Sequence, residues 1–136
     1  MSSILSIAAS GLASAIQRLQ VSANNVANAN SDGPTQAASA ATKAQYQPAY
    51  NAEQVNQTAT KGGGTATTVT NTQPGTVTTY NPTAPYADQN GNVSAPKVDL
   101  TNEAVQQAIA SYQFTANADV MSVYQKMMKS LLNIQT

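Results

Sequence analysis

Residues 99–134 read DLTNEAVQQAIASYQFTANADVMSVYQKMMKSLLNI. Apolar side chains recur in this stretch every three or four residues, which places them along one face of an α-helix. Asp99 or Thr101 can cap the first turn, and Glu103 lies where the helix dipole favours a carboxylate. The sequence therefore predicts one helix from about Asp99 to Asn133, with an apolar stripe made of Val105, Ile109, Tyr112, Ala116, Val120, Val123, Met127 and Leu131.

A second helical pattern covers residues 3 to about 30. Large and small residues alternate there in steps of three and four, as in the seam of a coiled coil. Because one row of the seam is small, a partner helix can approach it closely. The helix should end where cap- and turn-forming residues accumulate, from Asn28 to Pro34. Its predicted seam is Leu5, Ala8, Leu12, Ala15, Leu19 and Val26.

These two helices are long for a chain of 136 residues. At about 1.5 Å per residue, the C-terminal helix spans roughly 50 Å and the N-terminal helix roughly 40 Å. They can pair in an antiparallel or staggered way, but one small core cannot cover all their apolar side chains. We therefore predict a mainly α fold, with two long terminal helices packed as a coiled-coil-like pair and further apolar contacts made to neighbouring subunits.

The middle of the chain is rich in Ala, Gln, Thr, Asn and Gly and cannot build a strong core by itself. Thr65–Thr70 and Thr76–Tyr80 favour strands, and a turn at Gln73–Gly75 would pair them as a β-hairpin. The Gly62–Gly64 run lacks the residues of a phosphate loop and is interpreted as a flexible joint. One structural unit with three zones is expected: an N-terminal helix in 1–32, an extended and hairpin segment in 33–98, and a C-terminal helix in 99–136.

The composition argues against most catalytic functions. The chain has no Cys and no His, and its six Lys and Arg residues balance its six Asp and Glu residues. Thiolate and imidazole chemistry and most transition-metal sites are thereby removed. Asp99 and Glu103 could be imagined as a catalytic pair, but helix capping explains them better. We expect no catalytic, cofactor or metal site and, without a basic cluster, no nucleic-acid partner.

The segment Met1–Leu19 has no basic region, and its apolar runs are broken by Ser10, Gly11 and Ser14. It is predicted to be neither a cleavable signal peptide nor a membrane span, so we expect no direct insertion into a membrane. The absence of Cys suits an extracytoplasmic setting. A protein of this kind would leave the cytoplasm by a route that reads no conventional signal.

Asn24, Asn25, Asn28 and Asn30 form the densest polar cluster, and Asn24 and Asn28 lie one helical turn apart. Their amide groups could form hydrogen bonds with another subunit. Alternatively, the cluster is the solvated end of the helix. The pattern alone leaves both interpretations open.

Two segments resemble bacterial flagellar rod and hook proteins. Residues 23–28 read ANNVAN and follow an Arg18-Leu19 pair, which is similar to the N-terminal signature of that family. Residues 98–133 resemble its C-terminal helix. The approach from Tyr80 to Asp99 is most similar to the proximal rod members, although residues 35–79 are unusually rich in Thr and Ala.

The resemblance implies a structural subunit that assembles through its terminal helices into the periplasmic drive shaft of the flagellum, which transmits torque. It also implies export without a cleaved signal. The implied partners are other copies of the chain, rod proteins of the FlgB, FlgF and FlgG types, and the membrane ring and export apparatus. The implied contacts are the two apolar rows together with Asn24, Asn25, Asn28 and Asn117. The alternative function is a small secreted interaction module or effector with a helical-hairpin core.

Overall fold

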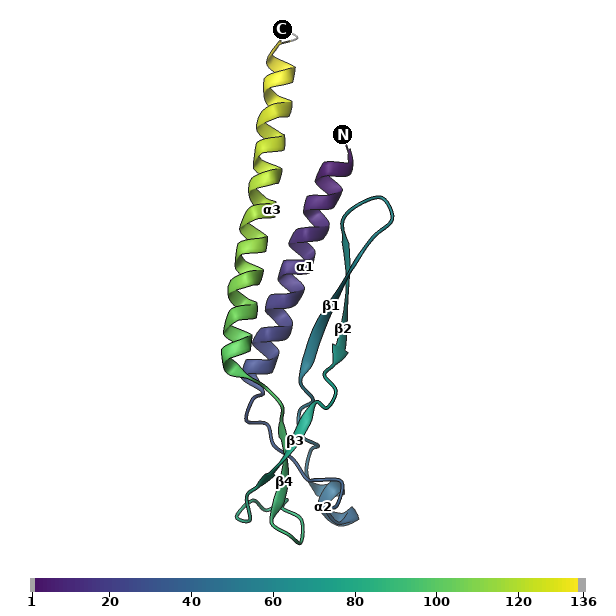
Figure 1. The fold of residues 1–136 in the computed structure, drawn as a ribbon, viewed down its shortest axis with the longest axis vertical. Coiled ribbons are helices and arrows are strands. Elements are labelled where there is room, and N and C mark those ends of the chain that lie inside the picture. The colour runs from purple at the N-terminus through teal and green to yellow at the C-terminus, as the bar shows by residue number, and fades with distance from the viewer. Residues whose placement is uncertain (1, 135–136) are drawn as a thin grey trace.

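The computed structural model describes residues 2–134 and is elongated (Figure 1). Helices α1 (Ser2–Ala27) and α3 (Leu100–Ile134) lie side by side and antiparallel, so both ends of the chain are at the same end of the molecule. α3 runs on past the start of α1 (Figure 1). The elements between them are the short helix α2 (Ala40–Gln45) and the strands β1 (Glu53–Ala59), β2 (Thr65–Asn71), β3 (Thr76–Tyr80) and β4 (Asn92–Pro96).

The start of α3 is fixed by Asp99. Its Oδ1 accepts hydrogen bonds from the backbone N–H groups of Thr101 at 2.9 Å and Asn102 at 3.2 Å. These are two of the N–H groups that a helix leaves without an internal partner at its N-terminus. Asp99 rather than Thr101 is therefore the cap, and the predicted long C-terminal helix is confirmed.

α1 ends at Ala27, slightly before the predicted end near residue 30. The backbone carbonyl of Asn24 accepts two hydrogen bonds of 3.0 Å, one from the backbone N–H of Asn28 and one from its side-chain Nδ2. The Asn28 amide thus supplies a local partner for the last turn, and the chain leaves the helix there.

The strands pair differently from the prediction. The strands predicted at Thr65–Thr70 and Thr76–Tyr80 are present as β2 and β3, but their pairing with each other was wrong. β2 pairs antiparallel with β1, whose polar sequence gave no strand signal. β3 pairs antiparallel with β4, with Tyr80 opposite Asn92.

Glycine conformation explains the observed pairing. Gly62, Gly63 and Gly64 have φ values of 115°, 94° and 90°, in the left-handed region where glycine alone is comfortable, and they form the loop between β1 and β2. The glycine run thus forms the turn of the β1–β2 hairpin. The predicted turn at Gln73–Gly75 instead connects β2 of one sheet to β3 of the other. There the carbonyl of Gly75 accepts hydrogen bonds from the amides of Ala52, just before β1, and Lys97, just after β4, at 3.2 and 2.9 Å.

A small core lies beyond the lower end of the helix pair, around β4. The side chain of Val93 is completely buried, with Ala38, Ala49 and Ala52 also buried. Gly33 and Ser94 exchange two backbone hydrogen bonds of 2.9 Å, which join the segment after α1 to β4. This core is built mostly from alanine. It holds the segments that connect the helices and strands, but it does not cover the apolar faces of α1 and α3.

Candidate subunit interface

The seam between α1 and α3 is made of small residues. Ala15 and Ala110 are each 1 % exposed, and Ala8 is buried on the same face of α1. A Cβ on Gly11 would lie 2.5 Å from Oδ1 of Asn117, so a larger residue there would have to displace the Asn117 side chain. The small row of the predicted seam therefore faces α3.

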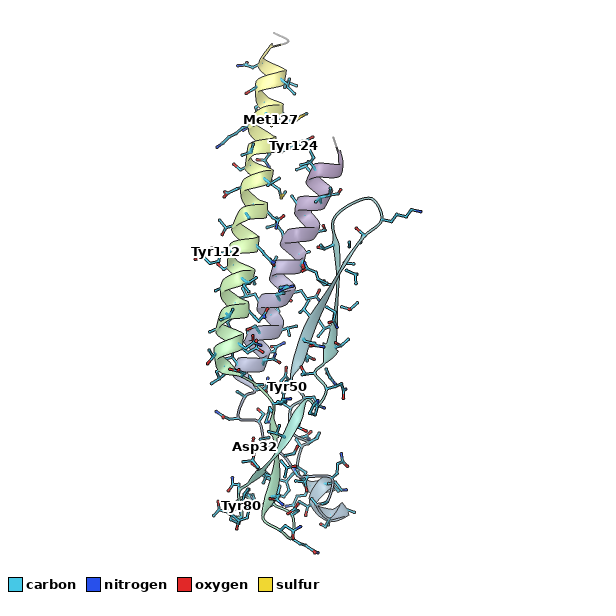
Figure 2. The ribbon with its side chains drawn as sticks, viewed as in Figure 1. Asp32, Tyr50, Tyr80, Tyr112, Tyr124 and Met127 are labelled. Carbon is cyan, nitrogen blue, oxygen red and sulfur yellow. The ribbon has the colours of Figure 1, made fainter. Side chains whose placement is uncertain are left out.

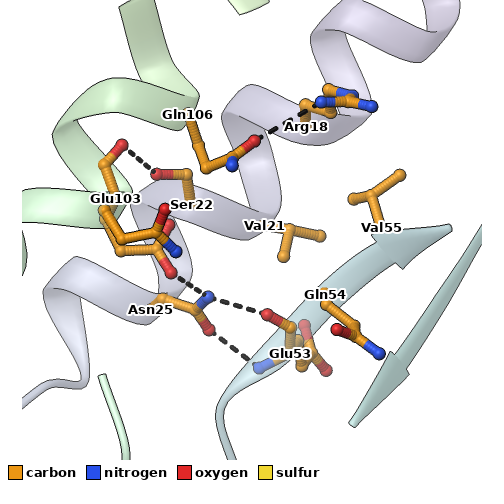
Figure 3. Close-up of a pocket in the computed structure, with 10 residues that line it drawn as sticks. Arg18, Val21, Ser22, Asn25, Glu53, Gln54, Val55, Glu103 and Gln106 are labelled. Atoms are coloured by element: carbon orange, nitrogen blue, oxygen red, sulfur yellow. Dashed lines mark hydrogen bonds between the residues drawn. The ribbon is translucent and has the colours of Figure 1, made fainter. Parts of the chain in front are cut away.

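Asn25 closes the lower end of this seam and is 2 % exposed. Its Nδ2 donates to Oε1 of Glu103 at 2.7 Å and to the backbone carbonyl of Glu53 at 2.8 Å (Figure 3). Its Oδ1 accepts from the backbone N–H of Glu53 and from the hydroxyl of Tyr50, both at 3.0 Å. One amide thus uses its full donor capacity and both acceptor positions to join α1, α3, β1 and the segment before β1. We call Asn25, Tyr50, Glu53 and Glu103 the Asn25 node.

Glu103 is buried in this node and has a second link to α1. The hydroxyl of Ser22, which is also buried, donates to the backbone carbonyl of Glu103 at 3.1 Å (Figure 3). Because a buried polar group without a partner is costly, the first turn of α3 is held in place by these specific bonds as well as by packing.

The β1–β2 hairpin packs on α1 almost entirely through polar contacts. Thr65 donates its backbone N–H to Oγ of Ser10 at 3.1 Å, and Gln57 and Thr67 bond to Ser14 and Gln17. Arg18 of α1 forms hydrogen bonds with both the β1–β2 hairpin and α3. Its guanidinium donates to Oε1 of Gln57 at 2.9 Å. It also donates to Oε1 of Gln106 on α3 at 3.4 Å (Figure 3).

The pKa values of two ionisable groups, Tyr50 and Asp88, differ from their ordinary values. Burial raises the pKa of the Tyr50 hydroxyl, and the negative charges of Glu53 and Glu103 raise it further. The pKa of Asp88 is lowered, chiefly because its carboxylate accepts the backbone N–H of Asn92 at 2.9 Å. The carboxylate also accepts from the N–H of Asn90 and the hydroxyl of Thr35. Asp88 therefore ties the loop before β4 to the segment that follows α1.

The predicted apolar stripe of α3 lies beside the seam with α1 and stays largely exposed, and its last residues, from Val120 to Leu131, line a groove with Ile4 of α1. Figure 2 shows Tyr112 projecting from the outer side of α3, where it is 78 % exposed. Leu131 is 54 % exposed, and the other large stripe residues are exposed to a comparable degree. The positions that do face α1 are buried or half-buried residues, mostly small or polar: Glu103, Gln106, Ala110, Gln113, Asn117, Met121 and Tyr124. The helix pair therefore uses the small and polar face of α3 for its contact with α1, and the predicted apolar stripe stays largely outside that contact.

Among residues 2–134, two apolar hollows are lined by residues of both α1 and α3. The larger, about 450 Å³, is an end groove lined by Ile4 of α1 and by residues of α3 from Asp119 to Leu131. The smaller, about 270 Å³, lies between Ile16 and Leu19 of α1 and Phe114 of α3. Both are places where an apolar side chain from another molecule can be accommodated.

The sequence-predicted contact residues fall into two groups in the structure. Ala8, Ala15, Asn25 and Asn117 lie in the intramolecular seam or the Asn25 node, with Leu5 and Leu12 half-buried beside them. The exposed group contains Leu19, Asn24, Val26, Val105, Ile109, Tyr112, Ala116, Val120, Val123, Met127 and Leu131. Asn28 is half-buried and bonds to Asn24 and Ser31 at the end of α1.

Sequence reasoning missed three partners of Asn25. Tyr50 and Glu53 lie in a segment that was expected to be irregular, and Glu103 was assigned only to helix capping. The available signal was an acidic residue on the buried side of α3, since a carboxylate is rarely buried without a partner.

By length and composition alone, the segment Ile4–Ala27 of α1 could cross a membrane. It carries three buried polar side chains, however, which bond within the molecule: Ser14 to Gln57, Ser22 to Glu103, and Asn25 to its node. Such bonds are typical of a helix that packs against protein. Among residues 2–134, no group of three or more His, Cys, Asp and Glu side chains is placed to hold a metal ion.

Comparison with known proteins places these elements in context. Residues 5–35 match the family described as "Flagella basal body rod protein", and residues 89–134 match "Flagellar basal body rod FlgEFG protein C-terminal". The chain is 35 % identical over 138 residues to the flagellar basal-body rod protein FlgC of Salmonella typhimurium (strain LT2), covering 96 % of this chain and 95 % of that one. It is 34 % identical to FlgC of Escherichia coli O6:H1 over 134 residues and to FlgC of Yersinia enterocolitica over 132 residues, with the same coverage.

Proposed function

This chain belongs to the flagellar basal-body rod protein family, and from that premise we propose how it is built into the rod. It is a structural subunit of the rod in the flagellar basal body, and it assembles there with other rod proteins. We infer that its two terminal helices make the contacts between subunits. The observation that carries this inference is the apolar stripe of α3, whose large side chains stay substantially exposed among residues 2–134.

The surface area of the chain supports assembly. Its 14.0 kDa expose 8931 Å². A compact monomer of that mass exposes roughly 6,700 Å² by the usual scaling of area with mass. The excess of roughly 2,200 Å² is comparable to the total area that a standard protein–protein interface buries. Much of the exposed area is apolar and lies on α1 and α3, so burial between neighbours stabilises the assembly.

The two groups of predicted contact residues suggest a division of labour. We propose that the exposed group contacts neighbouring subunits, whereas the seam and the Asn25 node hold the three zones, 1–32, 33–98 and 99–136, as one unit. Asn24 is the amide of the signature that is free to reach another subunit, since it is exposed, and the side chain of Asn28 bonds within the helix end.

We propose that the neighbours are further copies of the chain, rod proteins of the FlgB, FlgF and FlgG types, and the membrane ring and export apparatus. The proposed location is the proximal part of the rod in the periplasm, with no direct insertion into the membrane and no nucleic-acid partner. The lack of any basic cluster and the internal bonding of the polar groups of α1 support these two exclusions.

Export without cleavage is supported by the packing of α1. The first half of the helix supplies Ala8, Gly11 and Ala15 to the seam with α3. Removal of this segment as a signal peptide would expose the matching face of α3. The intact mass of the chain isolated from basal bodies tests the proposal, and a mass lacking the residues before Ala15 would refute it.

The proposed role is mechanical rather than catalytic. Helices that pack closely along their length resist twisting, which suits a shaft that transmits torque. The polar groups around Asn25 bond to one another and join separate elements, as expected of a structural node.

Assembly of the purified chain, alone or with other rod proteins, tests the proposed function. Sedimentation and electron microscopy should detect ordered polymers whose amount rises with concentration. A chain that stays monomeric at all concentrations and in the presence of other rod proteins would contradict the proposal. The same chain should also restore motility to a strain from which the gene has been deleted.

A further inference from the structure

The end groove is a continuation of the seam between α1 and α3. α3 continues beyond the start of α1 (Figure 1), and the groove is formed where Ile4 meets the overhanging part of α3. Val120, Val123, Met127 and Leu131 line it. An antiparallel helix occupies the seam below the groove, so the surface above it has the shape and spacing to receive another helix.

α1 offers a ridge of the right chemistry. Ile16, Leu19 and Val26 are exposed and share one face of the helix, with Ala23 between them. Arg18 is the single charged residue from Ser2 to Ala27, and its guanidinium is already bonded to Gln57 and Gln106. The three ridge residues therefore bring no charge into the groove, whose lining has Asp119 as its one charged residue.

We propose that, in the assembled rod, the Ile16–Leu19–Val26 ridge of one copy lies in the end groove of the next copy. This proposal rests on the proposed function, because it names the partner surface for part of the α3 stripe. The groove and the ridge are different surfaces at different heights on the molecule, so the contact is head-to-tail and leaves a free ridge and a free groove at the two ends. Such a contact produces an open helical polymer with one polarity, whereas groove-to-groove contact would close into a dimer.

Cysteine cross-linking tests the contact directly, because the natural chain has no Cys. The test protein is the full chain carrying Leu19→Cys and Val123→Cys. Within one molecule these positions cannot form a disulfide. Leu19 shares a hollow with Phe114, and Val123 lies nine residues further along α3, about 13 Å at the helical rise. A disulfide requires Cα atoms within about 7 Å of each other.

The matched control carries Leu19→Cys and Val77→Cys. Val77 lies on β3, far from the groove, and is 41 % exposed against 54 % for Val123. Under assembling conditions and mild oxidation, the Leu19–Val123 variant should give a ladder of cross-linked species on a non-reducing gel. Its cross-linked fraction should exceed that of the control several-fold.

Three other outcomes of these experiments are possible, and they contradict different parts of the proposal. Polymers that form without preferential Leu19–Val123 cross-linking would overturn the docking proposal and leave the proposed function standing. Efficient dimer formation by Val123→Cys alone would overturn it too, because the groove would then pair with itself. Failure of the natural chain to assemble both alone and with other rod proteins would remove the proposed function and the docking contact together.

Discussion

At the scale of single residues, Asn25 is the most consequential side chain of the signature run. Its neighbours in the run, Asn24 and Asn28, are exposed or bonded only within the helix end, whereas Asn25 makes four hydrogen bonds to three other segments. A side-chain amide suits this position because it donates and accepts at once. A carboxylate could not donate to Glu103 in its charged form.

The exchange Asn25→Ala is expected to lower the free energy of unfolding by at least about 2 kcal/mol. It leaves the buried carboxylate of Glu103 and the backbone of Glu53 unpaired, and each such loss costs about 1–3 kcal/mol. Urea denaturation measures the effect. Asn24→Ala is the matched control, which should change stability by no more than about 0.5 kcal/mol because Asn24 is exposed.

If Asn24→Ala instead destabilised the chain as much as Asn25→Ala, the run would act through the helix end and not through the node.

Tyr50 gives the node a dependence on pH. Its hydroxyl has a pKa above the ordinary value of 10.0, chiefly through burial. The stability that this shift supplies is fully present below pH 10.0 and is lost as the pH rises through the higher pKa of the folded state. Above about pH 10, stability should fall more steeply in the natural chain than in Tyr50→Phe.

Phe at position 50 removes both the titration and the hydrogen bond to Asn25. The variant should therefore be less stable at neutral pH, by about 1 kcal/mol. Parallel slopes in the alkaline range would mean that folding does not raise the pKa of the Tyr50 hydroxyl.

At the scale of elements, the seam between α1 and α3 depends on small residues. Ala15→Leu is expected to lower the free energy of unfolding by about 1–3 kcal/mol, because the added atoms meet Ala110 on the facing helix. Ala13→Leu places the same side chain on an exposed position of α1 and should change stability by no more than about 0.5 kcal/mol. Thermal unfolding followed by circular dichroism compares the two. Equal stability of both variants would show that the helices can separate freely.

The helices themselves could be predicted from the sequence, because periodicity and capping residues are local signals. Asp99 marks the start of α3, and the accumulation of Asn and Gly marks the end of α1. Strand positions in the Thr-rich segments could also be predicted from β-branched residues.

The sequence did not predict which strands pair or which helix faces pack together, because both depend on residues that are far apart in the sequence. β1 is polar and gave no strand signal, so β2 was assigned to the wrong neighbour. The helix pair uses the small and polar face of α3 for its contact with α1, and the predicted apolar stripe stays largely outside that contact. The Asn25 node joins residues from three separate stretches of sequence, and no short sequence pattern indicates that these residues are in contact.

At the scale of the whole molecule, many large apolar residues, which form the core of most proteins, lie on the surface of this chain. Val123→Gln or Met127→Gln should leave the free energy of unfolding of the monomer within about 0.5 kcal/mol, because both residues are exposed. Each variant should raise the protein concentration needed for assembly several-fold, as measured by sedimentation. Val77→Gln, a similarly exposed valine on β3, should change neither quantity. Unaltered assembly of the α3 variants would show that the stripe is not part of the interface.

The central claim is that the outer stripe of α3, bare in the single chain, is covered when subunits assemble. Methionine oxidation read by mass spectrometry tests it most directly, because Met127 is 59 % exposed and lies in the end groove, while Met121 is already half-buried in the single chain. Relative to Met121, Met127 should oxidise quickly in the monomer and several-fold more slowly in isolated rods. Equal oxidation of Met127 in monomer and rod would contradict the claim.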